Sequence, residues 1–183
     1  MVDAWVLIEL LTRKSSAEDW THRPLSLAGA RITGVLDLEA ATLTRPLHLQ
    51  DCYVENPFVL RDTQAVFIEL PGCHLPSLDA DNLHTRGDLA LNDQFAATGQ
   101  VRLPGAHIGG HPDCTGGTFT NKDEVALVGE GLVAGGAMVC GHGFAATGQV
   151  RLVDAHIGGH LNCTGGAFTG KDEAAHRPDL PCT

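Results

Sequence analysis

The segment AHIGGHLNC, from Ala155 to Cys163, contains residue types that bind transition metals. Two histidines stand four residues apart in it, and a cysteine follows three residues after the second histidine. Imidazole nitrogens and thiolates are common ligands of zinc in proteins. The segment is therefore either a metal site or a piece of scaffold that resembles one, and the elements that position it decide between the two.

The same segment belongs to an internal repeat. Residues 95–119, FAATGQVRLPGAHIGGHPDCTGGTF, return 49 positions later at residues 144–168 as FAATGQVRLVDAHIGGHLNCTGGAF, with 20 of 25 residues identical. A more diverged copy, LSLAGARITGVLDLEAATL, covers residues 25–43 and keeps the order of the apolar positions. Self-similarity of this kind is the signature of a repeat architecture in which each unit stacks on the next.

Within each unit the apolar residues form short alternating pairs, such as Val150 with Leu152 and Ala155 with Ile157. Alternation over three residues indicates a very short strand whose two ends face inward. The spacing of the pairs predicts a coil with four sides. Four inward columns with a step near 24 or 25 residues follow, one for each side: Leu78, Leu103, Leu127 and Leu152; Leu83, Ile108, Leu132 and Ile157; Leu91, Cys114, Cys140 and Cys163; Phe95, Phe119, Phe144 and Phe168.

Two earlier coils bring the expected total to six. Their inward residues are Leu27, Ile32, Leu38 and Leu43 in the first coil, and Leu49, Val54, Leu60 and Ala65 in the second. Residues 66–77, VFIELPGCHLPS, fit the columns poorly and require either a five-residue insertion or a shift of register. Six strands stacked at about 4.8 Å predict a rod roughly 25 to 30 Å long.

The ends of the chain differ from the repeats. Ala4, Leu7, Ile8 and Leu11 have the spacing of one helical face, and Asp3 is suited to be the N-cap. A short helix that covers the first coil is expected, because solenoid ends must be covered. The chain is thus predicted to be an all-β solenoid at residues 25–168, with an N-terminal helix and cap at 1–24 and a tail at 169–183.

A recurring pattern of alanine, one residue, then leucine, phenylalanine or isoleucine appears as AGARITG, EAATLTR, DAHIGG and DADNLHT. Over roughly Leu25 to Phe168 it resembles the pentapeptide-repeat family. The resemblance implies a right-handed quadrilateral β-helix, here of about six coils. Some family members are acidic rods that mimic DNA, bind DNA gyrase and protect it from poisons, whereas many have no assigned role.

Placed on such a coil, the histidines and cysteines separate. Ile157 and Cys163 face inward and His156 faces outward, so one ion is not expected to bind both kinds of residue. The same argument applies to the first copy, with His107, His111 and Cys114. We therefore expect no metal site, no cofactor and no catalytic residues. The stacked cysteines are expected to be inert core thiols, with a redox-sensitive stack as the alternative.

Charge limits the partners. The chain has 12 lysines and arginines against 22 aspartates and glutamates, a net charge of −10 that disfavours nucleic acid and anionic membranes and suits a basic partner surface. The carboxylates of residues 25–93 form patches without two continuous tracks. The charged segments NKDE at 121–124 and GKDE at 170–173 are expected to be solvated loops, with an elaborated binding surface as the alternative.

The expected function is that of a non-enzymatic scaffold that binds a protein partner through the surface of the rod. The alternative is a DNA-mimicking modulator or protector of DNA gyrase or topoisomerase. A bacterial setting is expected. Within the cell the expected location is the cytoplasm, because Asp3 and Glu9 do not suit a signal peptide. Phe168 would be exposed on the last coil, which makes a homodimer through a solenoid end a further expectation.

Overall fold

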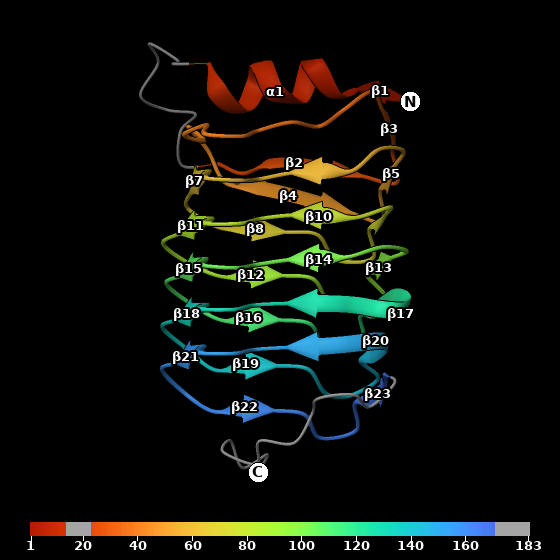
Figure 1. Ribbon diagram of the computed structural model, residues 1–183. Coiled ribbons are helices and arrows are strands. Elements are labelled where there is room, and N and C mark those ends of the chain that lie inside the picture. Colours follow the sequence, from red (N-terminus) through yellow and green to blue (C-terminus); the bar gives the residue numbers. More distant parts are fainter. Residues whose placement is uncertain (14–22, 171–183) are drawn as a thin grey trace.

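The computed structural model describes residues 1–13 and 23–170. These residues form a parallel β-solenoid of about six coils with one short α-helix at its N-terminal end (Figure 1). Each coil has four sides, numbered here 1 to 4 in chain order, and each side is a column of short parallel strands. The predicted fold class is confirmed. Most of the predicted tail lies outside the described residues.

Sides 1 and 4 are separate parallel sheets. Side 1 contains β2 (Leu25–Ala28), β4 (Leu47–Gln50), β8 (Ile68–Glu69), β12 (Leu89–Ala90), β16 (Pro112–Asp113), β19 (Met138–Val139) and β22 (Leu161–Asn162). Side 4 contains β7 (Gln64–Ala65), β11 (His84–Thr85), β15 (His107–Ile108), β18 (Val133–Ala134) and β21 (His156–Ile157).

Sides 2 and 3 are joined into one sheet, because two long strands continue around the corner between them. Side 2 contains β1 (Val2–Asp3), β3 (Arg31–Thr33), β5 (Tyr53–Val54), β9 (His74–Leu75), β13 (Ala96–Ala97), the first parts of β17 (Thr118–Val128) and β20 (Ala145–Arg151), and β23 (Ala167–Thr169). Side 3 contains β6 (Phe58–Val59), β10 (Leu78–Asp79), β14 (Val101–Arg102) and the last parts of β17 and β20.

The expected stacking of the first two coils is confirmed. Leu27 pairs with Leu49 on side 1, and Ile32 pairs with Val54 on side 2. Isolated bridges from Asp37 to Val59 and from Thr42 to Gln64 continue the same register on sides 3 and 4. The inward residues of these two coils are buried, except for the half-buried Leu27, because each strand alternates one inward and one outward side chain.

Three of the four predicted columns, those of side 3, of side 4 and of the phenylalanines, are wrong by two residues in part. On side 3, Leu78 and Leu127 each pair with Val101, and Leu127 pairs with Val150, so Leu103 and Leu152 belong to the second inward position of their strand segments. On side 4, Ile108 pairs with Thr85 and not with Leu83. Each side has two inward positions, both usually apolar, so hydrophobicity alone does not distinguish them.

Residues 66–77 need no insertion. They contain β8 and β9, and Ile68 pairs with both Leu47 and Leu89 in regular register. Of the two alternatives, the shift of register is therefore correct. The mismatch arose because the predicted columns were out of register at this point, whereas the pairing of the chain is regular. The segment NKDE at 121–124 also differs from the expected loop, because β17 runs through it with an irregular register against β20.

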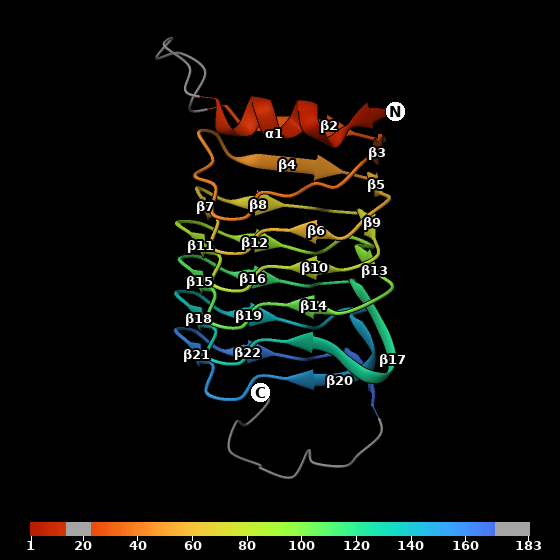
Figure 2. The same cartoon turned by 45° about the horizontal axis from the view of Figure 1, so that its top comes forward.

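The predicted helix is confirmed as α1 (Ala4–Thr12), which lies across the first coil (Figure 2). The side chain of Asp3 is the N-cap and accepts a hydrogen bond from the backbone N–H of Trp5 at 2.9 Å. Leu7 and Leu11 are buried against the coil, and the Leu11 carbonyl accepts a hydrogen bond from the Thr44 N–H. No helix in the described part of the chain is long and apolar enough to span a membrane.

The outer surfaces of the two ends carry exposed aromatic residues. Trp5 on α1 is 65% exposed, and Phe168 on β23 is 45% exposed. The exposure of Phe168 agrees with the sequence-based expectation for the last coil. Association of two copies through a solenoid end stays a prediction, which sedimentation velocity over a range of protein concentrations tests.

The phenylalanine column is a continuous stack. The ring centroids of Phe95, Phe119, Phe144 and Phe168 follow one another at 5.5, 5.1 and 5.2 Å. The backbone positions alternate, however, because Phe119 pairs with Ala97 and Ala146 rather than with the other phenylalanines. A glycine, Gly117, takes the position in its coil that corresponds to Phe95. Each coil therefore supplies one ring, from alternate positions of the strand.

Candidate binding surface on side 4

The outward residues of side 4 differ in charge from those of side 3. On side 4 they form one column in register: Thr42, Gln64, His84, His107, Val133 and His156. No residue of the five side 4 strands carries a carboxylate. In a chain with a net charge of −10, side 4 is thus a surface that neutral and basic residues dominate.

Side 3 carries alternating acids and arginines that pair along the rod. Arg61 contacts Glu39 at 2.8 Å, and Arg102 contacts Asp81 at 2.5 Å. Farther along, Arg151 contacts Glu130 at 2.5 Å. The hydrogen bond from Arg102 to Asp81 raises the pKa of this guanidinium, although burial opposes the shift. Side 3 therefore compensates its own charges and leaves few free for a partner.

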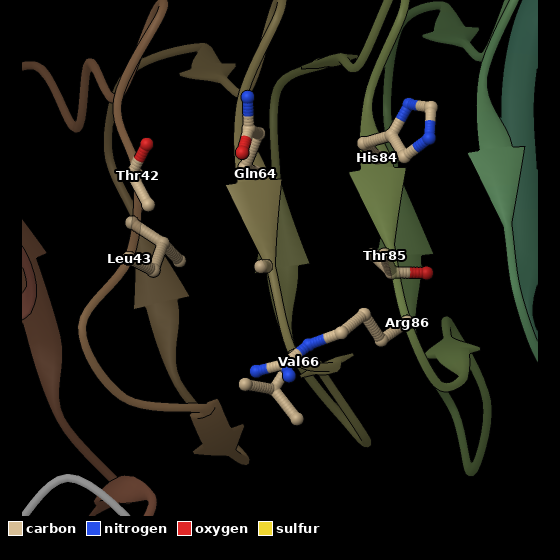
Figure 3. A pocket seen from close by; sticks show the side chains of 8 residues that line it. Thr42, Leu43, Gln64, Val66, His84, Thr85 and Arg86 are labelled. Carbon is tan, nitrogen blue, oxygen red and sulfur yellow. The ribbon is translucent and has the colours of Figure 1, made fainter.

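A hollow of about 280 Å³ opens on side 4 in the first three coils. Thr42, Gln64 and His84 line it with polar groups, and the remaining lining residues are Leu43, Ala65, Val66, Thr85 and Arg86. Figure 3 shows His84 and Arg86 at opposite ends of the hollow, with the Arg86 side chain extended toward Val66. Donors and acceptors thus surround a partly apolar floor, as in many ligand and peptide sites.

Arg86 has no ion-pair partner within residues 1–13 and 23–170, whereas Arg61, Arg102 and Arg151 each have at least one. It is also exposed. In the next coil, Gly109 occupies the position that corresponds to Arg86. A Cβ atom at Gly109 would lie 2.3 Å from the Arg86 carbonyl oxygen. The glycine therefore permits the tight corner and leaves the guanidinium without a neighbouring side chain from that position.

The hollow also depends on a buried hydroxyl. Thr85 is 3% exposed, and its hydroxyl donates a hydrogen bond to the Gly87 carbonyl at 2.7 Å. Burial of a hydroxyl is tolerated when it is hydrogen-bonded. This bond fixes the chain where it leaves β11, and with it the start of the Arg86 side chain.

The structure separates the histidines and cysteines of the two AHIGGH segments, as the sequence predicts. His107 and His156 are exposed, whereas Cys114 is buried and Cys163 is partly buried. His111 lies at a corner, where its Nδ1 accepts a hydrogen bond from the Ala137 N–H at 3.0 Å. Within the described ranges, no group of three or more histidine, cysteine, aspartate or glutamate residues is placed to hold a metal ion.

The cysteines form two stacks and no disulfide in the described chain. Cys114, Cys140 and Cys163 occupy successive coils of side 1, as predicted, and Cys52 and Cys73 form a second stack on side 2. A hydrogen bond with Cys140 and burial raise the pKa of Cys114. In the second stack, the hydrogen bond between the two thiols raises the pKa of Cys73 and lowers that of Cys52. Buried protonated thiols such as those of Cys114 and Cys73 are poor nucleophiles.

Sequence reasoning did not identify Arg86, Gln64 or Thr42 as site residues. The outward positions of Gln64 and Thr42 followed from the register, but the lack of an acid beside Arg86 depends on which side chains the coils bring together.

No family model, curated protein or solved structure matches the chain.

Proposed function

We propose that the protein is a non-enzymatic scaffold of the pentapeptide-repeat type that binds a protein partner through side 4, in a bacterial cytoplasm. The observation that carries the proposal is Arg86, an exposed guanidinium without an ion-pair partner in the described chain, at the edge of the side 4 hollow. The adjoining strands contain no carboxylate that would compete for it.

The chemistry of the hollow favours a partner segment that carries an aspartate or glutamate. A guanidinium binds a carboxylate through two parallel hydrogen bonds, which fixes orientation as well as adding affinity. The Gln64 amide and the Thr42 hydroxyl add donors and acceptors, and Leu43 and Val66 supply apolar contact. The net negative charge of the rod suggests a basic partner surface. For side 4 we propose an acidic partner segment instead.

DNA mimicry receives less support from the surface. A mimic of DNA presents continuous rows of free negative charge, whereas the acids on side 3 are paired with arginines. On side 1, Ala90 and Val139 interrupt the outward acids Glu69 and Asp113. A supercoiling assay with purified gyrase tests this alternative, and inhibition or drug protection at micromolar protein would restore it.

The proposal is tested by affinity capture from the native host with three baits. They are the wild-type protein, Arg86→Glu, and Arg61→Glu as a matched control from side 3. A bound partner should be recovered with the wild type and with Arg61→Glu, and should fall about tenfold or more with Arg86→Glu, because an attraction becomes a repulsion. Circular dichroism confirms that each bait is folded.

Two outcomes contradict the proposal. If Arg86→Glu captures the same partner as well as the wild type, side 4 is not the binding surface. If the Arg61→Glu bait alone loses the partner, binding occurs through side 3.

A further inference from the structure

Two histidines from adjacent coils lie directly opposite each other on side 4. His84 of β11 pairs with His107 of β15 in the parallel register. Their rings are stacked, with centroids 4.8 Å apart and planes 13° from parallel. Both side chains are exposed. The partner of His107 is thus 23 residues earlier in the chain and outside the local AHIGGH motif.

Each of the two rings offers a nitrogen atom to a ligand. The Nδ1 of His107 lies 3.0 Å from the Gly105 carbonyl oxygen, which only accepts hydrogen bonds, so Nδ1 carries the proton. In neutral imidazole the other nitrogen, Nε2, then has the free lone pair. A hydrogen bond from the ring nitrogen that does not bind the metal is how proteins orient metal-binding histidines. The His84 ring has no hydrogen-bond partner among the described residues.

We propose that His84 and His107 together chelate a divalent transition metal ion of the zinc, nickel or copper class. Imidazole suits these metals, and a site of two histidines leaves the other coordination positions to water or to a ligand from a partner. This proposal concerns the opposite end of the hollow from Arg86 and does not rest on the function proposed above. It also agrees with the finding that no group of three protein ligands exists in the described chain, because it needs only two.

Binding of one ion by both rings requires them to leave the stack, because the lone pairs of two nearly parallel rings do not converge. Two neighbouring nitrogens at about 2.1 Å from one ion lie roughly 3.0–3.4 Å apart, so at least one ring must rotate toward the other. Rotation about the last side-chain torsion of histidine meets only a broad, shallow barrier. The backbones of β11 and β15 are held by the ladder on both sides, so the two imidazoles stay within reach of each other.

The second repeat provides a matched control. His156 lies on the same side and in the same AHIGGH context, and its Nδ1 donates to the Asp154 carbonyl at 3.2 Å, as His107 donates to Gly105. Its neighbour in register is Val133 and not a histidine. His156 therefore has every local feature of His107 except the opposed imidazole.

Isothermal titration with Ni²⁺ as the probe tests the site on tag-free, full-length protein. The wild type is expected to bind one Ni²⁺ in the micromolar range. His84→Ala and His107→Ala should each weaken the affinity for Ni²⁺ about tenfold or more, because the remaining imidazole then binds the ion alone. His156→Ala should leave binding unchanged. Retained affinity in either of the first two variants, or an equal loss with His156→Ala, would overturn the proposal.

A gain-of-function variant completes the test. Val133 pairs with both His107 and His156, so Val133→His gives histidines in four successive coils, which can form two separate pairs instead of one. The number of Ni²⁺ ions bound should rise from one to two. An unchanged stoichiometry in the folded variant would contradict the proposal, because an opposed pair on this ladder would then be insufficient for binding.

Discussion

The two halves of the rod fill the corner between sides 1 and 2 differently. In the N-terminal half, each coil supplies two side chains of moderate size, Cys52 with Val54 and Cys73 with Leu75. In the C-terminal half, one aromatic ring and one small residue alternate in position, as Phe95 with Ala97 and then Gly117 with Phe119. The comparison shows that one volume of core accepts two packing solutions, and that the aromatic one constrains its neighbours more.

The largest expected effect is loss of a ring from the stack. Phe119→Ala should lower the free energy of unfolding by about 3–5 kcal/mol, because Phe119 is fully buried between two other rings. Urea unfolding measures it. Combined with Phe144→Ala, the loss should be non-additive, whereas Leu75→Ala combined with Phe144→Ala should be additive, because these residues are three coils apart. Additivity in both pairs would mean that the rings do not act as a stack.

The next effect tests the need for glycine. A Cβ at Gly117 would lie 2.7 Å from the Leu91 carbonyl oxygen and 2.8 Å from the ring of Phe119. Gly117→Ala should therefore cost about 1–3 kcal/mol of unfolding free energy, because neither neighbour has room to move. An unchanged midpoint of urea unfolding would show that the aromatic half is no more constrained than the other.

A pH-dependent effect follows from a buried thiol of the C-terminal half, Cys114. The pKa of Cys114 is raised above its ordinary value, so the folded protein holds this proton while the unfolded chain releases it. Stability is therefore complete below about pH 8 and falls as the pH rises above the ordinary thiol pKa, by about 1.4 kcal/mol per pH unit for each such thiol. Urea unfolding between pH 7 and pH 10 measures the slope.

Cys114→Ala should remove the contribution of this thiol and make the slope shallower. An equal slope in the wild type and in the folded variant would contradict the assignment.

The smallest effect is expected for Cys73→Ala at neutral pH. Its thiol donates to the Leu49 carbonyl at 3.2 Å, and loss of this bond and of one buried sulfur should cost about 1 kcal/mol. Alanine at position 73 is thus predicted to be tolerated, whereas alanine at 117, in the corresponding position two coils later, is not. Thermal unfolding of the two variants side by side compares them, and a larger loss for Cys73→Ala would reverse the comparison.

Much of the fold was predictable because burial repeats at regular intervals. The inward positions of the first two coils, the cysteine column of side 1 and the helix capped by Asp3 follow from alternation and helical spacing alone. The errors at Leu103 and Leu83 arose because each side has two inward positions of similar character. Only the hydrogen-bonded register chooses between them.

The candidate sites were less predictable, because each depends on a neighbour one coil away. His107 and His156 are in nearly identical sequences, yet only His107 lies opposite another histidine. Arg86 and Arg61 are both outward arginines, yet only Arg61 lies beside acids. Local sequence does not contain this information, since coil lengths vary and the distance to the neighbour along the chain varies with them.

The alternation of phenylalanine with glycine has a consequence for how such a rod is able to grow. A duplicated segment of one coil would interrupt the alternation, because two phenylalanines or two glycines would then occupy the same position in consecutive layers. A segment of two coils restores the alternation at its boundaries. The near-identical copies lie 49 residues apart, two coils and not one, which is the spacing that keeps this alternation intact.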